Sequence, residues 1–89
     1  MIDTEIEIIN KLGLHARAAA KFVHTANRFK SKITLSRDTR QIDGKSILGI
    51  LMLAAGQGTV LQLRVEGPDE QDACRDLKEL VRDRFGEGQ

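Results

Sequence analysis

The residues best suited to chemistry are a histidine and an arginine at the point where a loop runs into a helical pattern. Gly13 lies in the loop, His15 follows it, and Arg17 comes two residues later as the helical pattern begins. The first turn of a helix leaves backbone N–H groups unpaired at the positive end of the helix dipole, and such a site holds anions, phosphate above all. This arrangement predicts that His15 carries a phosphoryl group covalently and passes it on.

The chemistry of such a carrier fits an imidazole. A neutral imidazole is nucleophilic at neutral pH, because the unperturbed pKa of histidine is ~6.5. The P–N bond that it forms is reactive, and imidazole leaves readily as it takes up a proton. Backbone N–H groups at the helix start, that of Ala16 among them, would stabilise the phosphate oxygens, and Arg17 would add charge-assisted hydrogen bonds. This reaction needs neither a general base nor a metal ion.

Length and composition limit the classes of protein to which the chain can belong. Its 89 residues allow one domain, 1–89, in which we expect 86–89 to be a flexible tail. A net charge of +1 gives no general support to nucleic-acid or membrane-surface binding, and no run of ~18 apolar residues could span a membrane. Cys74 is the only cysteine, so we expect no disulfide within the chain and a cytoplasmic location. Together with His15 and His24 it has no metal-ligand spacing, so we expect no metal site.

Periods of two and of 3.6 residues divide the chain into seven elements. The order β-α-β-β-α-β-α, with strands that alternate between apolar and polar residues, predicts an α+β fold in which helices pack on one face of a four-stranded antiparallel sheet. The expected strands are 2–9, 32–36, 40–43 and 59–66, and the expected helices are 16–29, 47–53 and a last helix that starts after a cap at Asp69.

The second expected helix is apolar nearly all round. Ser46 stands at its N-cap position, and Ile50, Leu53 and Ala54 have the spacing of a core-facing stripe. The remaining apolar side chains form an exposed patch: Ile47, Leu48 and Leu51. The outer face of the first helix is basic instead, with a ridge formed by Arg17, Lys21, His24 and Arg28.

Two segments give the chain a family resemblance. The run Asn10-Lys11-Leu12-Gly13-Leu14-His15-Ala16-Arg17, together with Asp43-Gly44-Lys45-Ser46-Ile47, closely resembles the histidine-containing phosphocarrier protein (HPr) family of the bacterial phosphotransferase system. The resemblance covers nearly the whole chain. It implies an open-faced β-sandwich with the sheet order 1-4-2-3 and three helices on one face.

The resemblance also implies roles and partners. His15 would accept phosphate from enzyme I on Nδ1 and donate it to an A-type domain of an enzyme II or to a regulatory relative, with Arg17 bound to the phosphate. Ser46 would be the site modified by HPr kinase/phosphorylase. The protein would be a carrier in sugar transport and not a free-standing enzyme. The sequence itself is silent on oligomeric state, for which we take a monomer as the default, and we expect no cofactor. The surface that meets partners would comprise Lys21, His24, Ile47, Leu48 and Leu51.

Several alternatives stay open on the sequence alone. Ala18 stands where most members of the family have proline, which leaves room for a carrier of the nitrogen-related regulatory branch. A regulatory-only binding module of the same fold would act through phosphorylated Ser46 and would not need His15. Nucleic-acid binding through the basic ridge has little support, since the chain has no tyrosine or tryptophan. On single-residue grounds His15 could be a simple helix cap, and the ridge an ordinary solvated helix face.

Overall fold

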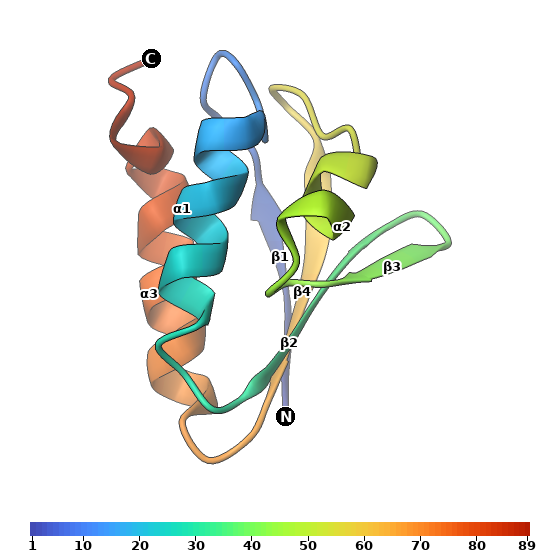
Figure 1. Cartoon of the computed structure of the whole chain (residues 1–89), viewed down its shortest axis with the longest axis vertical. Helices are drawn as coiled ribbons and strands as arrows, with labels where there is room; N and C mark the ends of the chain where they lie inside the picture. Colours follow the sequence, from blue (N-terminus) through green and yellow to red (C-terminus); the bar gives the residue numbers. More distant parts are fainter.

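The chain forms four strands and three helices in the expected order, followed by a short 3-10 turn. The computed structural model describes all residues from 1 to 89. The elements are β1 (Ile2–Glu7), α1 (Ala16–Ala26), β2 (Lys32–Arg37), β3 (Arg40–Asp43), α2 (Ile47–Met52), β4 (Val60–Glu66), α3 (Glu70–Arg82) and η1 (Arg84–Gly86). Figure 1 shows α1 and α3 side by side, with the start of α1 and the end of α3 at the same end of the molecule.

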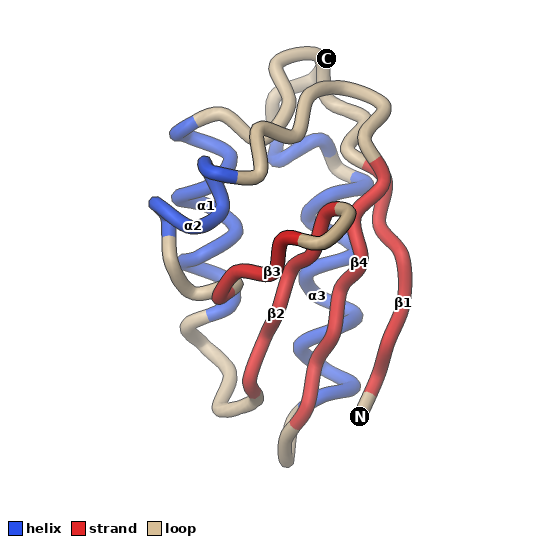
Figure 2. Tube along the Cα trace, turned by 90° about the vertical axis from the view of Figure 1, so that its right-hand side faces the viewer, coloured by secondary structure: helices blue, strands red, loops and turns tan.

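The sheet is antiparallel throughout and has the order β1-β4-β2-β3, which confirms the expected fold class (Figure 2). Alternation decides which face is covered. In β4, Leu61, Leu63 and Val65 are buried, while the residues between them are exposed. The exposed face carries polar side chains that pair across strands, such as Arg64 of β4 with Asp3 of β1 at 3.0 Å. One face of the sheet is therefore exposed to solvent, and the helices cover the opposite face.

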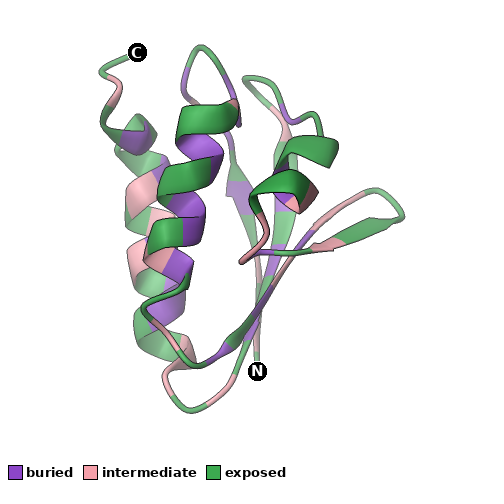
Figure 3. Cartoon of the chain, in the orientation of Figure 1, coloured by how far each residue is buried: buried purple, intermediate pink, exposed green.

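The core lies between the sheet and the helices. Phe22 of α1 and Leu77 of α3 are fully buried, and buried positions follow one side of each helix (Figure 3). The predicted extension of the first helix to residue 29 is wrong, since α1 ends at Ala26. The Asn27 N–H still donates to the Val23 carbonyl. The two amides after it bond back by three residues, from Arg28 to Thr25 and from Phe29 to Ala26, and this tighter turn ends the helix.

Helix α2 begins as predicted and ends differently. The Ser46 hydroxyl accepts a hydrogen bond from the Gly49 N–H at 3.0 Å, which makes Ser46 the N-cap. Ile50 and Leu53 are buried as expected. Ala54 is not: it is exposed and adopts a left-handed conformation with φ of 51°, because the helix has ended and the chain turns there. Ala55 enters the core in its place.

The start of α3 corrects the predicted cap. The Asp69 side chain makes no capping hydrogen bond to its own helix. Its carboxylate accepts instead from the backbone N–H groups of Lys30 and Ser31, at 2.9 and 3.0 Å, and from the Ser31 hydroxyl. Asp69 therefore joins the start of α3 to the segment before β2, and a capping pattern could not predict this contact.

Candidate functional site

The loop before α1 is held so that His15 lies at the helix start. Gly13 has φ of 70°, and a Cβ added there would lie 2.6 Å from the carbonyl oxygen of Ala55, so only glycine fits. The next residue, Leu14, is buried, and its N–H donates to the same Ala55 oxygen at 2.8 Å. Asn10 Nδ2 donates to the Gly13 carbonyl at 2.8 Å. These contacts fix the backbone that carries His15.

His15 is the N-cap residue of α1, and its side chain makes no capping hydrogen bond. The first helical hydrogen bond runs from the Ala19 N–H to the His15 carbonyl at 2.8 Å. The N–H groups of Ala16, Arg17 and Ala18 therefore have no partner within the chain. Three unpaired donors beside an imidazole are the arrangement that the sequence predicts at this helix start, and such an arrangement suits an anion.

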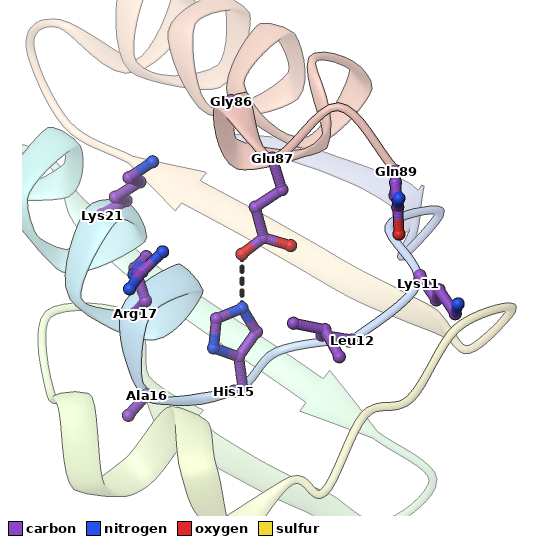
Figure 4. Close-up of a pocket in the computed structure, with 9 residues that line it drawn as sticks. All are labelled: Lys11, Leu12, His15, Ala16, Arg17, Lys21, Gly86, Glu87 and Gln89. Atoms are coloured by element: carbon purple, nitrogen blue, oxygen red, sulfur yellow. Dashed lines mark hydrogen bonds and ion pairs between the residues drawn. The ribbon is translucent and has the colours of Figure 1, made fainter.

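A hollow of about 650 Å³ opens around the imidazole. Cationic side chains reach it from two segments, Arg17 and Lys21 from α1 and Lys11 from the preceding loop (Figure 4). Arg17 is exposed and makes no side-chain hydrogen bond or ion pair, whereas Lys21 Nζ donates to the Phe85 carbonyl at 2.6 Å. Arg17 is thus the free guanidinium beside His15.

The sequence interpretation missed Glu87. The segment expected to be a flexible tail makes defined contacts: the buried Phe85 anchors it, and the Gln89 carbonyl accepts from the Lys11 N–H at 3.0 Å. Between these points Glu87 points into the hollow, and its Oε2 contacts His15 Nε2 (Figure 4). The helical spacing of Phe85 was the one available signal, because a buried residue there brings the last residues of the chain to the start of α1.

The second carboxylate oxygen of Glu87 is also engaged, since Asn10 Nδ2 donates to Oε1 at 2.9 Å. Burial alone would raise the pKa of the Glu87 carboxyl. The hydrogen bonds from Asn10 and His15, with the positive charges of His15 and Lys21, outweigh burial and lower that pKa. Glu87 is therefore a carboxylate at neutral pH, bonded on both oxygens.

The other predicted site residues lie outside the hollow. Ser46 is half-buried at the start of α2, which packs beside α1 (Figure 1). His24 is exposed on α1 and does not line the hollow. The apolar patch on α2 is exposed as predicted, and it includes one residue that the prediction left out, Met52: the exposures are 42% for Ile47, 70% for Leu48, 37% for Leu51 and 54% for Met52.

Comparison with known proteins decides the family. The family model described as "PTS HPr component phosphorylation site" matches residues 2–83. The chain belongs to the HPr family. The phosphocarrier protein HPr of Pseudomonas aeruginosa is 54% identical over 86 residues, 96% of each chain, and that of Neisseria meningitidis serogroup A is 51% identical over the full length of both. The crystal structure of HPr-C-His from Thermoanaerobacter tengcongensis is 47% identical and superposes with a TM-score of 0.94 over 98% of both chains.

Membership in the HPr family makes the chain a phosphocarrier of the phosphotransferase system, and the family implies partners such as enzyme I and enzyme II. A structure described as an HPr dimer from Thermoanaerobacter tengcongensis is also similar, with 47% identity and a TM-score of 0.79 over 98% of this chain. No group of three His, Cys, Asp or Glu side chains could hold a metal ion. None of the helices combines the length and the apolar character that crossing a membrane requires.

Proposed function

We propose that His15 receives a phosphoryl group on Nδ1 from phosphorylated enzyme I and donates it to an A-type domain of an enzyme II or to a regulatory relative. The observation that carries this proposal is the position of the ring at the N-cap of α1. There it adjoins three unpaired backbone N–H groups, and its Nε2 is already bonded to Glu87. Nδ1 is then the nitrogen free to bond to phosphorus, and the N–H groups lie where phosphate oxygens need donors.

Arg17 would bind the phosphate once it is on the ring. Its guanidinium has no other partner and lines the same hollow, so it can turn toward the phosphate without breaking an existing contact. A positive charge there also favours a loose, metaphosphate-like transition state. The family model and the relatives named phosphocarrier protein HPr support the proposal that the chain acts as a carrier and not as a free-standing catalyst.

The partner surface that we propose adjoins this site. It comprises the α2 patch, Ile47, Leu48, Leu51 and Met52, with Lys21 and His24 on the outer face of α1. Phosphorylation of Ser46 by HPr kinase/phosphorylase would add about two negative charges beside that patch and oppose docking. We infer a monomer, because the 21-residue core closes within one chain, and a cytoplasmic location, which suits a lone cysteine.

A regulatory-only module of the same fold is less well supported. Such a module would act through Ser46 and would need neither an imidazole at position 15 nor free donors around it. This chain has both, which favours the carrier.

The experiment that tests the proposal is incubation with enzyme I and phosphoenolpyruvate, followed by intact mass before and after mild acid. We expect wild type to gain one acid-labile phosphoryl group and His15→Ala to gain none. His24→Ala is the matched control, since His24 is the other histidine of the chain, and it should behave as wild type. Label that persists in His15→Ala, or that resists acid in wild type, would contradict a phosphohistidine at position 15.

A further inference from the structure

We propose that Glu87 is a positioning residue for phosphoryl transfer. Its carboxylate accepts the Nε2–H of His15 and holds the proton on that nitrogen, so that Nδ1 keeps the lone pair that bonds to phosphorus. This inference rests on the proposed function, because it assigns a second residue to the same site.

The contact between Glu87 and His15 is built into the fold. Asn10 is wholly buried, and its Nδ2 donates both to Glu87 Oε1 and to the carbonyl oxygen of Gly13, at 2.9 and 2.8 Å. One buried amide thus orients the carboxylate and the loop that carries the imidazole. Only 12% of the Glu87 side chain and 29% of the His15 side chain are exposed, so water competes little for the bond between them.

The backbone on both sides of Glu87 is also held. Phe85 is fully buried, and its carbonyl oxygen accepts from Lys21 Nζ at 2.6 Å. The Glu87 N–H donates to the Arg84 carbonyl at 3.0 Å, and the Lys11 N–H donates to the Gln89 carbonyl at 3.0 Å. Because the backbone before and after Glu87 is held and the buried Asn10 amide orients its carboxylate, Glu87 can select one tautomer of the His15 ring.

The choice of tautomer decides which nitrogen of His15 can bond to phosphorus. In the neutral ring, only the tautomer with hydrogen on Nε2 can donate to Glu87, and that tautomer has its lone pair on Nδ1. Nδ1 forms the N–P bond with this pair as the bond from phosphorus to the donor breaks, and the donor keeps the electrons of that bond. The ring then has a phosphoryl group on Nδ1 and a hydrogen on Nε2, which makes it formally cationic.

Glu87 stabilises this cationic ring by its charge and its hydrogen bond. When the phosphoryl group leaves for an acceptor, the electrons of the N–P bond return to Nδ1, and the ring is again neutral with its hydrogen still on Nε2. No proton has to come from solvent or move to Glu87. The lowered pKa of the Glu87 carboxyl agrees with an acceptor that stays ionised.

The charged side chains that line the hollow differ in whether they are free to bind phosphate. Arg17 and Lys11 line the hollow and make no side-chain bond, so they remain available to phosphate. Lys21 lines it as well, beside Glu87, but is bound to the Phe85 carbonyl. Glu87 is the only acidic side chain that lines the hollow. Its contact with Nε2 keeps it on the ring edge away from phosphate on Nδ1, which limits repulsion between the two negative groups.

The first test uses unphosphorylated protein and so does not depend on the proposed function. Ring ¹⁵N chemical shifts report which nitrogen carries the hydrogen at a pH where the ring is neutral. We expect Nε2–H alone in wild type, and a rising share of Nδ1–H in Glu87→Gln, because the amide N–H₂ of glutamine can donate to Nε2. Gln89→Ala, in the same segment, is the control and should match wild type. Superimposable spectra of wild type and Glu87→Gln would overturn the proposal.

The second test uses protein phosphorylated by enzyme I and measures hydrolysis of the phosphohistidine against pH. Hydrolysis is fast while Nε2 keeps its hydrogen, and loss of the carboxylate that accepts this hydrogen should move the midpoint of the profile to lower pH. Glu87→Asp, which keeps the charge, should restore part of the shift, and Gln89→Ala should show none. An unchanged profile in Glu87→Gln would contradict the proposal. Failure of the proposed function would differ from this result, because wild type would then carry no acid-labile phosphate.

Discussion

At the scale of single residues, Arg17 is the guanidinium that lines the hollow around His15 without a partner in the chain, whereas Lys21 is bound to the Phe85 carbonyl. Hydrogen bonds to a charged group contribute about 1.5–3 kcal/mol, and water screens part of this at an exposed side chain. We therefore expect Arg17→Ala to slow phosphorylation by enzyme I by about tenfold, measured as the rate of acid-labile label. Arg28→Ala removes another cation of the basic ridge, one already paired with Asp76 at 2.9 Å, and should leave the rate unchanged. Equal defects in both variants would point to general charge instead of phosphate binding.

The residues around His15 also differ in whether neighbouring sequence was enough to predict their position. His15, Ala16 and Arg17 could be predicted because a helix start is encoded by adjacent residues, and its unpaired N–H groups follow from helix geometry. Glu87 could not, since it lies 72 positions from His15 and reaches the site only when α1 and α3 pack together. Periodicity reports which side of an element is buried. It does not report which residues of distant elements meet.

At the scale of elements, substitutions of Ser46 can separate its effect on helix stability from its effect on docking. Ser46→Asp keeps a side-chain acceptor at the N-cap of α2, because aspartate caps as well as serine does, so we expect the melting temperature to stay close to that of wild type. It also places negative charge beside the proposed partner surface, and transfer from enzyme I should fall by at least about tenfold, the effect of a docking penalty of only about 1.4 kcal/mol.

Ser46→Ala should show the reverse pattern. Loss of the cap costs about 1 kcal/mol of folding free energy, while transfer should remain near the wild-type rate. Thermal melting and a phosphotransfer assay on both variants check the two effects together. If Ser46→Asp transferred at the wild-type rate, charge at this position would not control docking.

The first turn of α1 supports a second prediction at this scale. The Ala18 N–H has no partner in the chain, so Ala18→Pro breaks no hydrogen bond, and the fixed φ of proline suits a first turn. We expect stability to change by no more than about 1 kcal/mol, with a modest change in transfer rate because one donor near the phosphate is lost.

Ala19→Pro is the matched control. It removes the bond from Ala19 to the His15 carbonyl and should cost about 3 kcal/mol by chemical denaturation. Similar losses in both variants would contradict the free-donor interpretation.

At the scale of the whole molecule, alternation and helical spacing were enough to predict the element order and the covered face of the sheet. They did not predict where α1 ends, because the tighter bonds of Arg28 and Phe29 are a matter of geometry and not of residue type. The same limit applies to Ala54, which has the spacing of a core residue but follows the end of its helix. The sheet order 1-4-2-3 came from the family resemblance, since spacing alone leaves several orders possible.

Asp69 contributes to stability across the molecule, because its carboxylate links the segment before β2 to the start of α3. The Ser31 hydroxyl, and then the Lys30 N–H, lower the pKa of Asp69 from 3.8, although partial burial acts in the opposite direction. A carboxyl group whose pKa is lower in the folded state stabilises fully above its unfolded pKa. That contribution is lost as pH falls through the lower, folded value.

Asp69→Asn should therefore melt below wild type at neutral pH, since an amide replaces the charged acceptor for these donors. The difference should shrink as pH falls below about 4, where wild type loses the same contribution. Asp72→Asn is the control, because Asp72 is 62% exposed and pairs only with the neighbouring Arg75, and its melting curve should follow wild type at every pH. Melting temperatures of the three proteins from pH 7 to pH 2 check the expectation. A constant difference between Asp69→Asn and wild type over that range would assign the stability to shape and not to the ionised carboxylate.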